Sequence, residues 1–492
     1  MLSVEGSLLV MGGLGASWWE SMRARTRAAG AWLRPGTPLR RGQRPRETDD
    51  RRRVAAACGG VRTRLAVTAG RFAAGVSRRL GVGGGSVIAG RVAFAVSPRV
   101  LSRLASGRTS IVVTGTNGKT TTSHFVAAAL SGRGPVAHNA AGSNMPDGAV
   151  AALIAAPRAR LAVLEIDELH LGEVLDAVVP DVLVLLNLSR DQLDRVSEVR
   201  TTAAAIHGLL IRHQHVVVIA NADDPLVVWA AGTAGRVVWV AAGTRWQGDT
   251  LGCPRCGHRL ERHTIGEPPG PWHCTGCGLR RPSPRWWWQT DPHDTIWRID
   301  AAPIEVRLSL PGRVNLGNAT MALAAVAQIG TDPAAVAPAL GEVTEVAGRY
   351  GRLSHRGRTV RVLLVKNPAG WGEALDMLPA GRSVLVMVNA READGRDVSW
   401  LWDLSVDGLR GRAVAVAGER AADAGVRLSY ADIPHRTDTD LRRALDLLPP
   451  GPVDALANYT AFLDLKRSLD PHGPQHLERP SRDTPQEPLR AS

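Results

Sequence analysis

A glycine-rich segment that ends in a lysine and two threonines is the most chemically specific feature of the sequence. It lies between an apolar run at 111–114 and a helical pattern at 120–130. Its residues are Gly115, Thr116, Asn117, Gly118, Lys119, Thr120 and Thr121. Glycines let a loop turn tightly and aim its N–H groups at phosphate oxygens, while the lysine adds a positive charge and the Thr120 hydroxyl can bind Mg²⁺. The segment therefore predicts a loop that binds the phosphates of ATP.

Two carboxylates close an apolar run at 161–166, which we expect to be a buried parallel strand. Glu165 and Asp167 are two positions apart, so an extended chain places them on one face. Carboxylates at the C-terminal end of a parallel strand point into the ligand crevice, where one of them can hold Mg²⁺ directly or through water. We expect Glu165 to be the magnesium ligand, and a solvated strand end is the alternative.

A second polar group follows the apolar run at 182–188. Asn187, Asp191 and Asp194 are predicted to lie at the same edge of the sheet as the carboxylates of the first group. A magnesium or substrate site would use these side chains. A helix that begins with acidic residues in its first turn is the alternative.

Four of the five cysteines form two Cys-x-x-Cys pairs, each closed by a glycine, and 17 residues separate the pairs. The four are Cys253, Cys256, Cys274 and Cys277. Four thiolates at this spacing predict a closed, tetrahedral site for a structural Zn²⁺. A zinc ribbon also raises the possibility of nucleic-acid binding, with Trp272 and the run Trp286–Trp288 available to stack on bases. Tryptophan clusters more often pack a small module, and we expect no nucleic-acid partner.

An acidic loop at 389–400 follows another apolar run, at 384–388. Its carboxylates include Asp394 and Asp397, on either side of a glycine. Loops between a strand and a helix often carry functional residues. From the residues alone, a turn with a helix cap is as good an interpretation as catalysis.

Composition sets the wider limits. The net charge is +14, and residues 1–60 hold 11 arginines against five acidic residues. Lysine occurs only at Lys119, Lys366 and Lys466, so its presence in the glycine-rich loop stands out. No run approaches about 20 apolar residues, so we expect no membrane-spanning helix. Paired cysteines without a secretory N-terminal pattern indicate a reducing compartment.

The elements that must position these residues are predicted from the apolar pattern. Continuous apolar runs of strand length alternate with helical segments, which is typical of parallel sheets covered by helices on both faces. We expect an α/β fold, with a central parallel-sheet ATPase domain that carries a Cys₄ zinc-ribbon insertion and a Rossmann-like C-terminal domain. The expected boundaries are 1–60 for a disordered basic extension, 61–343 for the central domain, about 248–290 for the zinc-ribbon insertion, 344–469 for the C-terminal domain and 470–492 for a disordered tail.

Taken together, these segments resemble the Mur ligase superfamily. The glycine-rich loop, the strand-end Glu165 and the later pair Asn315 and Asn318 match the nucleotide-binding motifs of that superfamily. The four cysteines and the segments 366–372 and 394–400 narrow the resemblance to the MurT family, the ATP-binding subunits of lipid II isoglutaminyl synthases. The resemblance runs from about residue 61 to residue 469.

The resemblance implies a carbon–nitrogen ligase of cell wall biosynthesis that uses ATP and Mg²⁺. ATP would phosphorylate the α-carboxylate of D-glutamate in the peptidoglycan stem peptide of lipid II. Ammonia would then displace phosphate and leave D-isoglutamine. The enzyme would be cytoplasmic, at the inner face of the plasma membrane, and would meet the membrane surface only peripherally.

The ammonia needs a source outside this chain. A cysteine-dependent glutaminase needs a nucleophilic thiol beside a histidine base, but four cysteines are assigned to zinc and Cys58 lies next to the arginine-rich extension. The resemblance implies a partner, a GatD-like glutaminase related to class I amidotransferases, in a heterodimer. It also implies that Asp397 completes the Cys-His triad of that partner, where it would orient the histidine.

Two departures from the superfamily pattern are visible. Lys366 and Lys466 lie outside the central domain, so we expect no carbamylated lysine at the magnesium site. Gln192 stands where many relatives carry a histidine. Two alternatives stay open: a Mur- or folylpolyglutamate-type ligase that joins an amino acid, and a nucleic-acid-binding NTPase with a zinc ribbon.

Overall fold

The structure is a computed structural model that describes residues 49–79, 86–190, 199–244, 246–262, 271–290, 293–344 and 350–469. The chain divides into two compact units, Met1–Cys58 and Gly59–Ser492. The expected disorder of residues 1–48 and 470–492 concerns residues outside the described part. Helix α2 (Asp49–Arg79) begins inside the range predicted to be a disordered extension. Arginine and alanine, which dominate that part of the helix, are strong helix formers.

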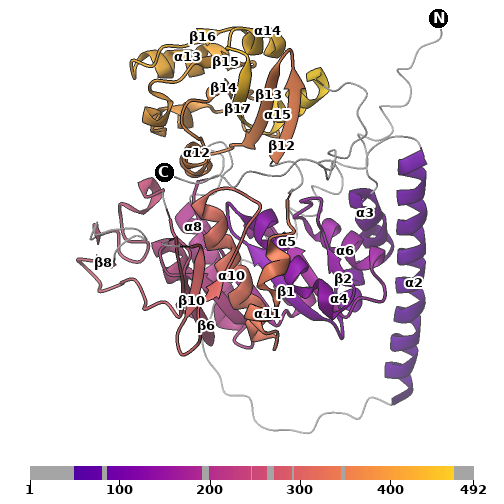
Figure 1. Cartoon of the computed structure of the whole chain (residues 1–492). Coiled ribbons are helices and arrows are strands. Elements are labelled where there is room, and N and C mark those ends of the chain that lie inside the picture. The colour runs from indigo at the N-terminus through magenta and orange to yellow at the C-terminus, as the bar shows by residue number, and fades with distance from the viewer. Residues whose placement is uncertain are drawn as a thin grey trace, which may run out of the picture. The chain divides into compact units, whose positions relative to one another are not determined.

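A nine-stranded sheet forms the centre of the first domain (Figure 1), with the order β11-β10-β9-β6-β5-β4-β1-β3-β2. The strands from β2 to β9 in that order are parallel, and β10 and β11 add an antiparallel edge. The strands are β1 (Thr109–Thr114), β2 (Val136–His138), β3 (Leu161–Glu165), β4 (Val182–Leu185), β5 (Val217–Asn221), β6 (Arg236–Ala241), β9 (Trp286–Gln289), β10 (Thr295–Arg298) and β11 (Ile304–Glu305). Strands β1, β3 and β4 are almost wholly buried, which explains their continuous apolar runs.

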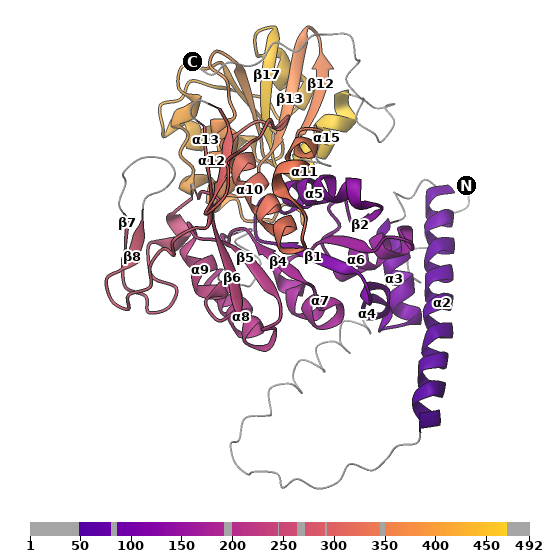
Figure 2. The ribbon, with the colours of Figure 1, turned by 60° about the horizontal axis from the view of Figure 1, so that its bottom comes forward.

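Helices cover both faces of this sheet and form two separate apolar cores. One face is covered by α3 (Ser86–Val96), α4 (Val100–Ala105), α6 (Pro146–Ala155), α7 (Leu171–Val178), α8 (Val199–Arg212) and α9 (Pro225–Ala231). The other is covered by α5 (Lys119–Leu130), α10 (Arg313–Gln328) and α11 (Pro333–Leu340). The view in Figure 2 shows the two groups on either side of the strands. Helices α5 and α10, which carry the predicted nucleotide residues, therefore share one face.

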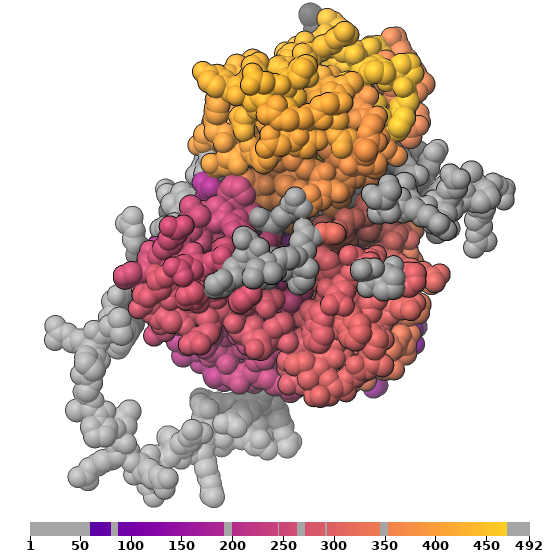
Figure 3. Space-filling view, turned by 60° about the vertical axis from the view of Figure 1, so that its left-hand side comes forward, coloured from indigo at the N-terminus to yellow at the C-terminus, as the bar shows by residue number. Residues whose placement is uncertain are grey.

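The cysteine-rich insertion is smaller than the sequence predicted. Its own sheet has two antiparallel strands, β7 (Leu260–Arg262) and β8 (Trp272–Cys274). The run Trp286–Trp288, which we expected to pack the insertion, instead forms β9 and pairs with β6 and β10 in the main sheet. The insertion therefore ends before Trp286. In the space-filling view, residues of this part of the central domain are drawn in pink and salmon (Figure 3).

The C-terminal domain has a six-stranded sheet in the order β12-β13-β17-β14-β15-β16. All neighbours are parallel except β12 and β13. The strands are β12 (Tyr350–His355), β13 (Arg358–Leu364), β14 (Ser383–Met387), β15 (Val414–Ala417), β16 (Arg436–Thr437) and β17 (Gly451–Ala457). The helices are α12 (Pro368–Asp376), α13 (Ala421–Ser429), α14 (Leu441–Asp446) and α15 (Tyr459–Leu469). Both domains confirm the predicted α/β class.

Candidate nucleotide site, metal centre and acidic loop

The glycine-rich loop connects β1 to α5, as predicted. Gly115 and Gly118 have φ angles of 133° and 83°, which side chains with a Cβ rarely adopt. A Cβ atom on Gly118 would lie 2.7 Å from Oδ1 of Asn318 on α10. Glycine is therefore required at Gly118 both by the backbone conformation and by the close approach of α10. The loop delivers the N-terminus of α5 to the C-terminal edge of the sheet, the position at which helices bind phosphate.

Lys119 is buried in this loop, with 3% of its side chain exposed. Its ammonium group donates to the carbonyl oxygens of Gly115 at 2.5 Å and Thr116 at 3.3 Å. It also forms an ion pair of 3.0 Å with Glu168 in the short 3₁₀ helix η4 (Glu168–His170). The Lys119 ammonium group thus already faces oxygen atoms, so it is aligned to bind an anion. A phosphate oxygen that enters the loop must replace one of these partners.

Glu165 and Thr120 form the part of the site that could hold Mg²⁺. The Thr120 hydroxyl donates to Oε1 of Glu165 at 3.1 Å, while Oε2 of Glu165 is buried and lacks a hydrogen-bond partner. Asn139 fixes the end of the strand, because it exchanges two hydrogen bonds with the Glu165 backbone, at 2.8 and 2.9 Å. A buried carboxylate oxygen without a donor, beside a hydroxyl oxygen, matches the oxygen ligands that Mg²⁺ prefers.

Asp167 does not join this group, although the sequence placed it on the same face as Glu165. Strand β3 ends at Glu165, and Asp167 turns to cap η4, accepting the Leu169 N–H at 3.1 Å. The alternation of side chains stops where the strand stops. Glu168, which the sequence analysis did not single out, faces Lys119 instead.

Asn187 braces the glycine-rich loop from β4. Its side chain accepts the Asn117 N–H at 2.9 Å and donates to the Asn117 carbonyl at 3.0 Å. The Thr116 hydroxyl accepts the Ser189 N–H at 3.0 Å, which ties the same two loops together. Asn187 therefore has a positioning part in the site. The other members of that predicted group, Asp191 and Asp194, lie outside the described residues, as does Gln192.

The amide side chains of α10 close the other side of the loop. Asn315 and Asn318 are both buried, and Nδ2 of Asn318 donates to Oδ1 of Asn315 at 3.2 Å. Asn315 in turn donates to the Pro311 carbonyl at 2.6 Å. The two asparagines thus lie beside Gly118, where buried amides can recognise a polar ligand group.

The C-terminal domain also reaches the loop. Asn117 and Asn367 exchange two side-chain hydrogen bonds, each of 3.3 Å. Oδ1 of Asn367 accepts the Gly370 N–H at 2.8 Å and so caps α12. A pocket of about 50 Å³ adjoins these residues, and its lining includes Lys366 and Glu373. The segment 366–372 therefore contacts the nucleotide loop. The spacing of residues in the sequence did not reveal this contact.

The four paired cysteines converge as predicted. Their sulfur atoms all lie within 4.8 Å of one another, with 3.6 Å between Cys253 and Cys277 and 3.5 Å between Cys256 and Cys274. A tetrahedral Zn²⁺ with Zn–S bonds of about 2.3 Å requires sulfur atoms roughly 3.8 Å apart. Gly257, with a φ of 80°, lets its N–H turn back to the Cys253 carbonyl at 2.9 Å. The cluster fits a structural zinc ion.

Buried charges and a tryptophan attach the insertion to the central sheet. Arg281 donates to Asp223 at 2.6 Å, and the Asp223 side chain is fully buried. Burial raises the pKa of Asp223, and Arg281 opposes that effect. Trp272, which is 1% exposed, donates its indole N–H to the Ala222 carbonyl at 3.2 Å. Because Trp272 is buried, as are Trp286 and Trp288, these rings cannot stack on nucleic-acid bases.

Asp224 links the same corner to the nucleotide site. Its carboxylate accepts the Leu188 N–H at 2.8 Å and the Leu226 N–H at 2.9 Å, which caps α9. Burial raises the pKa of Asp224 to about 6, although these backbone donors lower it. Leu188 follows Asn187, so the attachment of the insertion and the brace of the glycine-rich loop meet at consecutive residues. The sequence signal for this corner was the Asn-Ala-Asp-Asp segment after β5.

Asp397 lies in an exposed part of the 389–400 loop. Its carboxylate accepts the Ser399 N–H at 2.8 Å, and this hydrogen bond, with that of the Ser399 hydroxyl, holds the pKa of Asp397 below its ordinary value. Gly395 precedes it with a φ of 84°. The loop therefore presents an ionised carboxylate to solvent.

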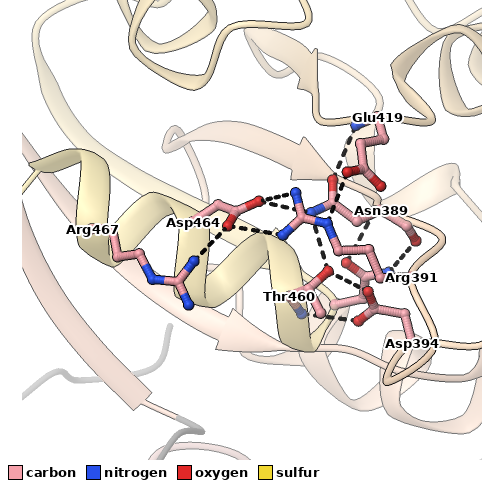
Figure 4. Close-up of polar contacts among 8 residues, drawn as sticks. Asn389, Arg391, Asp394, Glu419, Thr460, Asp464 and Arg467 are labelled. Carbon is pink, nitrogen blue, oxygen red and sulfur yellow. Dashed lines mark hydrogen bonds and ion pairs between the residues drawn. The ribbon is translucent and has the colours of Figure 1, made fainter. Parts of the chain in front are cut away.

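A buried hydrogen-bond network holds this loop from behind (Figure 4). Asp394 accepts the Thr460 N–H at 2.9 Å and also the Thr460 hydroxyl, which caps α15. Asn389 donates to Thr460 and to Asp464, both at 3.1 Å. Arg391 forms ion pairs with Glu419 at 2.8 Å and Asp464 at 2.7 Å. Of the two loop aspartates, Asp394 thus anchors the loop and Asp397 is exposed to solvent.

Family models match two parts of the chain. A Mur ligase middle domain model matches residues 113–247, and a MurT ligase C-terminal model matches residues 364–462. The first range contains the glycine-rich loop and Glu165, and the second contains Asp397 and its network. Each model therefore falls within the domain of one sheet, and residues 248–363, which include β9, β10, β11 and β12, lie outside both matches.

Curated relatives match most of the chain. The MurT subunit of a lipid II isoglutaminyl synthase (glutamine-hydrolyzing) from Staphylococcus aureus strain N315 is 28% identical, over 78% of this chain and 93% of the relative. The subunit with the same name from Streptococcus pneumoniae is 28% identical, over 83% and 97%. A pseudomurein peptide ligase type C from Methanothermus fervidus has a similar fold, with a TM-score of 0.60 and 19% identity over 76% of this chain and 80% of that one.

Proposed function

We propose that this chain, a member of the MurT group of the Mur ligase family, is the ATP-dependent subunit of a glutamine-dependent amidating ligase. The substrate is the α-carboxylate of D-glutamate in the stem peptide of lipid II, and the product is D-isoglutamine. The MurT relatives, which this chain covers almost end to end, are named as subunits of a glutamine-hydrolyzing lipid II isoglutaminyl synthase. Among the described residues, no helix is long and apolar enough to cross a membrane. The proposed place of action is the cytoplasmic face of the plasma membrane, where a lipid-linked substrate is accessible.

The glycine-rich loop supplies the chemistry of activation. A carboxylate is a poor electrophile, and phosphorylation gives it a leaving group. A carboxylate oxygen attacks the γ-phosphorus of ATP and ADP leaves. Ammonia then attacks the carbonyl carbon, phosphate leaves and the nitrogen loses a proton. Lys119 and the N-terminus of α5 stabilise the charge on the transferred phosphoryl group. Thr120 and Glu165 would hold Mg²⁺, which neutralises phosphate charge when it is bound.

The single observation that carries the choice of nitrogen donor is the geometry of Asp397. The side chain is exposed and ionised, and its loop is anchored by Asp394. Such a carboxylate can orient a histidine on another protein and stabilise its charged form. The four paired cysteines are gathered in one cluster, so none of them has the place of a glutaminase nucleophile. We therefore propose a GatD-like glutaminase as partner in a heterodimer, with Asp397 completing its triad.

Release of ADP tests this function. The purified chain, supplied with ATP, Mg²⁺, lipid II and ammonium, should release ADP and form amidated lipid II, and addition of the glutaminase partner should let glutamine replace ammonium. Amino acids in place of ammonium should give no product. ADP release with an amino acid and not with ammonia would contradict the proposal and identify an amino-acid ligase instead.

The four-cysteine cluster is proposed to bind one structural Zn²⁺. The sulfur-to-sulfur distances fit a tetrahedral ion, and the second Cys of each pair is followed by a glycine that closes a turn. Elemental analysis should find one zinc per chain. Cys256→Ser should lose the zinc and lower the melting temperature, because a structural zinc contributes folding energy directly. Unchanged zinc content and melting temperature in that variant would refute the assignment.

A further inference from the structure

Helix α2 packs against the central domain with a face made of small residues. In the part of the helix from Gly60 onward, the buried positions are Ala66, Gly70, Ala74 and Ser77. A Cβ atom on Gly70 would lie 2.7 Å from the Ala89 carbonyl oxygen of α3. This face therefore allows close contact with the domain, and Figures 1 and 2 both show α3 and α6 on the same side of α2.

The opposite face carries large apolar side chains that remain exposed. The exposed fractions are 59% for Val61, 58% for Leu65, 73% for Phe72 and 39% for Val76. At about 100° per residue, these four positions fall within roughly 60° of the helix circumference, on the side away from the buried face. Single exposed apolar residues are ordinary, but an aligned row along one helix face indicates a binding surface.

Arginines line this apolar row. Arg62, Arg64, Arg78 and Arg79 are exposed, and residues 60–79 contain no aspartate or glutamate. By the same count of about 100° per residue, Arg79 is aligned with the row, and Arg62 and Arg64 lie on its two sides. Arg71 and Arg78 lie roughly 110° and 130° from the centre of the row. Arg71 donates to the Ile154 carbonyl at 3.2 Å. An apolar row flanked by cations, without acidic residues, is the pattern of helices that lie in the interface of an anionic membrane.

We infer that this outer face of α2, from Val61 to Arg79, docks on an anionic lipid surface, with its apolar row at the acyl boundary and its arginines among lipid phosphates. The inference rests on the proposed function, because a lipid-linked substrate requires the enzyme to work at a membrane.

Charge argues against the other occupants. Residues 1–48 hold eight arginines and three glutamates, so that segment is itself basic. The arginines on the outer face of α2 therefore repel it. A second copy of the helix would bring the same positive charges together.

Vesicle binding by the full chain tests the inference. The wild type should co-sediment with vesicles of phosphatidylglycerol and phosphatidylcholine in equal parts, and not with phosphatidylcholine alone. R62Q/R79Q should bind the mixed vesicles about 25-fold more weakly, since each arginine near an anionic surface contributes roughly fivefold. L65S/F72S should weaken binding at least about tenfold, because two large apolar side chains leave the interface. The matched control I211S/R212Q changes an exposed apolar residue and an arginine on α8 and should bind like the wild type.

Three results would overturn the inference: no binding by the wild type, equal binding to neutral vesicles, or unchanged binding by both α2 variants. The inference would also be overturned if another protein covers the apolar row. In that case L65S/F72S would differ from the wild type in its mass in solution without vesicles, and its vesicle binding would be unchanged. Melting temperatures of the two α2 variants confirm that they are folded. This readout needs no catalysis, so a failure of lipid II amidation leaves it unaffected, and amidation of a substrate without a lipid tail should be normal in both variants.

Discussion

The nucleotide loop and the Asp397 loop follow β1 and β14, each at the carboxyl end of a buried strand, but the chain treats them in opposite ways. Around Lys119, the described contacts all come from this chain, and the lysine itself is 3% exposed. Around Asp397, the buried hydrogen bonds end at Asp394 and the Asp397 carboxylate is exposed to solvent. In the proposed function, this chain encloses the first site, whereas it supplies only half of the second.

The difference follows from what each loop must bind. A nucleotide is small, so one chain can surround its phosphates with N–H groups and a lysine. The proposed partner histidine belongs to another protein, so this chain could only fix the direction of the Asp397 carboxylate. Its own hydrogen bonds lie behind the loop, where Thr460 donates to Asp394 and Asn389 donates to Thr460. Variants of the two loops should accordingly fail in different ways.

Asp397→Asn should show the largest difference between the two loops. An amide cannot stabilise the charged histidine of the proposed triad, so glutamine-driven amidation should fall by about 10⁴-fold. Amidation driven by free ammonium should keep its rate, because the nucleotide loop is untouched. Steady-state rates with each nitrogen donor, in the presence of the partner, measure the effect. The control Asp407→Asn changes an exposed carboxylate of the same domain and should be silent with both donors. Equal losses with glutamine and ammonium would remove the distinction between the loops.

Lys119→Met should slow the glutamine-driven and the ammonium-driven reactions alike, unlike Asp397→Asn. Activation of the carboxylate precedes attack by ammonia from any source. Loss of one charge that stabilises the transferred phosphoryl group should lower both rates by about 10²- to 10³-fold. Lys466→Met on α15 replaces a lysine far from the loop in sequence and should leave both rates unchanged. A Lys119 variant that lost only the glutamine-driven reaction would contradict the assignment of the loop.

Local patterns in the sequence predicted the first loop better than the second. The strand, glycines and helix around Lys119 are consecutive, so spacing alone placed them, and the continuous apolar runs gave the buried strands of both sheets. The contacts that join distant segments had no local signal: Arg281 meets Asp223 across 58 positions, and Asn117 meets Asn367 across 250. The expectation that Asp167 lies beside Glu165 failed because it depended on the residue at which β3 ends. The strand at Trp286 was missed because its partners are separated from each other in the sequence. Strand β6 precedes the insertion and β10 follows β9, so the run itself gives no local sign of the main sheet.

Thr460→Val should loosen the Asp397 loop without removing its carboxylate. The variant leaves Asp394 buried with one hydrogen bond fewer, a loss that costs about 1–3 kcal/mol. We expect the glutamine-driven rate to fall about tenfold, as a lower kcat at unchanged KM for glutamine, with the ammonium-driven rate preserved. Thr460→Ser keeps the hydroxyl and should restore the rate. If valine and serine behaved alike, the hydroxyl would have no part in positioning the loop.

Glu168→Gln should give the smallest effect and sharpen the account of the nucleotide loop. In the wild type, phosphate must displace Glu168 from Lys119. This ion pair is largely buried, so desolvation offsets much of its attraction, and its net contribution is on the order of 1 kcal/mol. Removing the carboxylate charge should therefore tighten ADP binding, measured by calorimetry without Mg²⁺, by up to about fivefold. Glu173→Gln changes an exposed carboxylate on α7 and should bind ADP like the wild type. Weaker ADP binding in Glu168→Gln would mean that the Glu168 carboxylate aligns Lys119 for phosphate and does not compete with phosphate. Glu168 would then be a further positioning residue of the nucleotide loop.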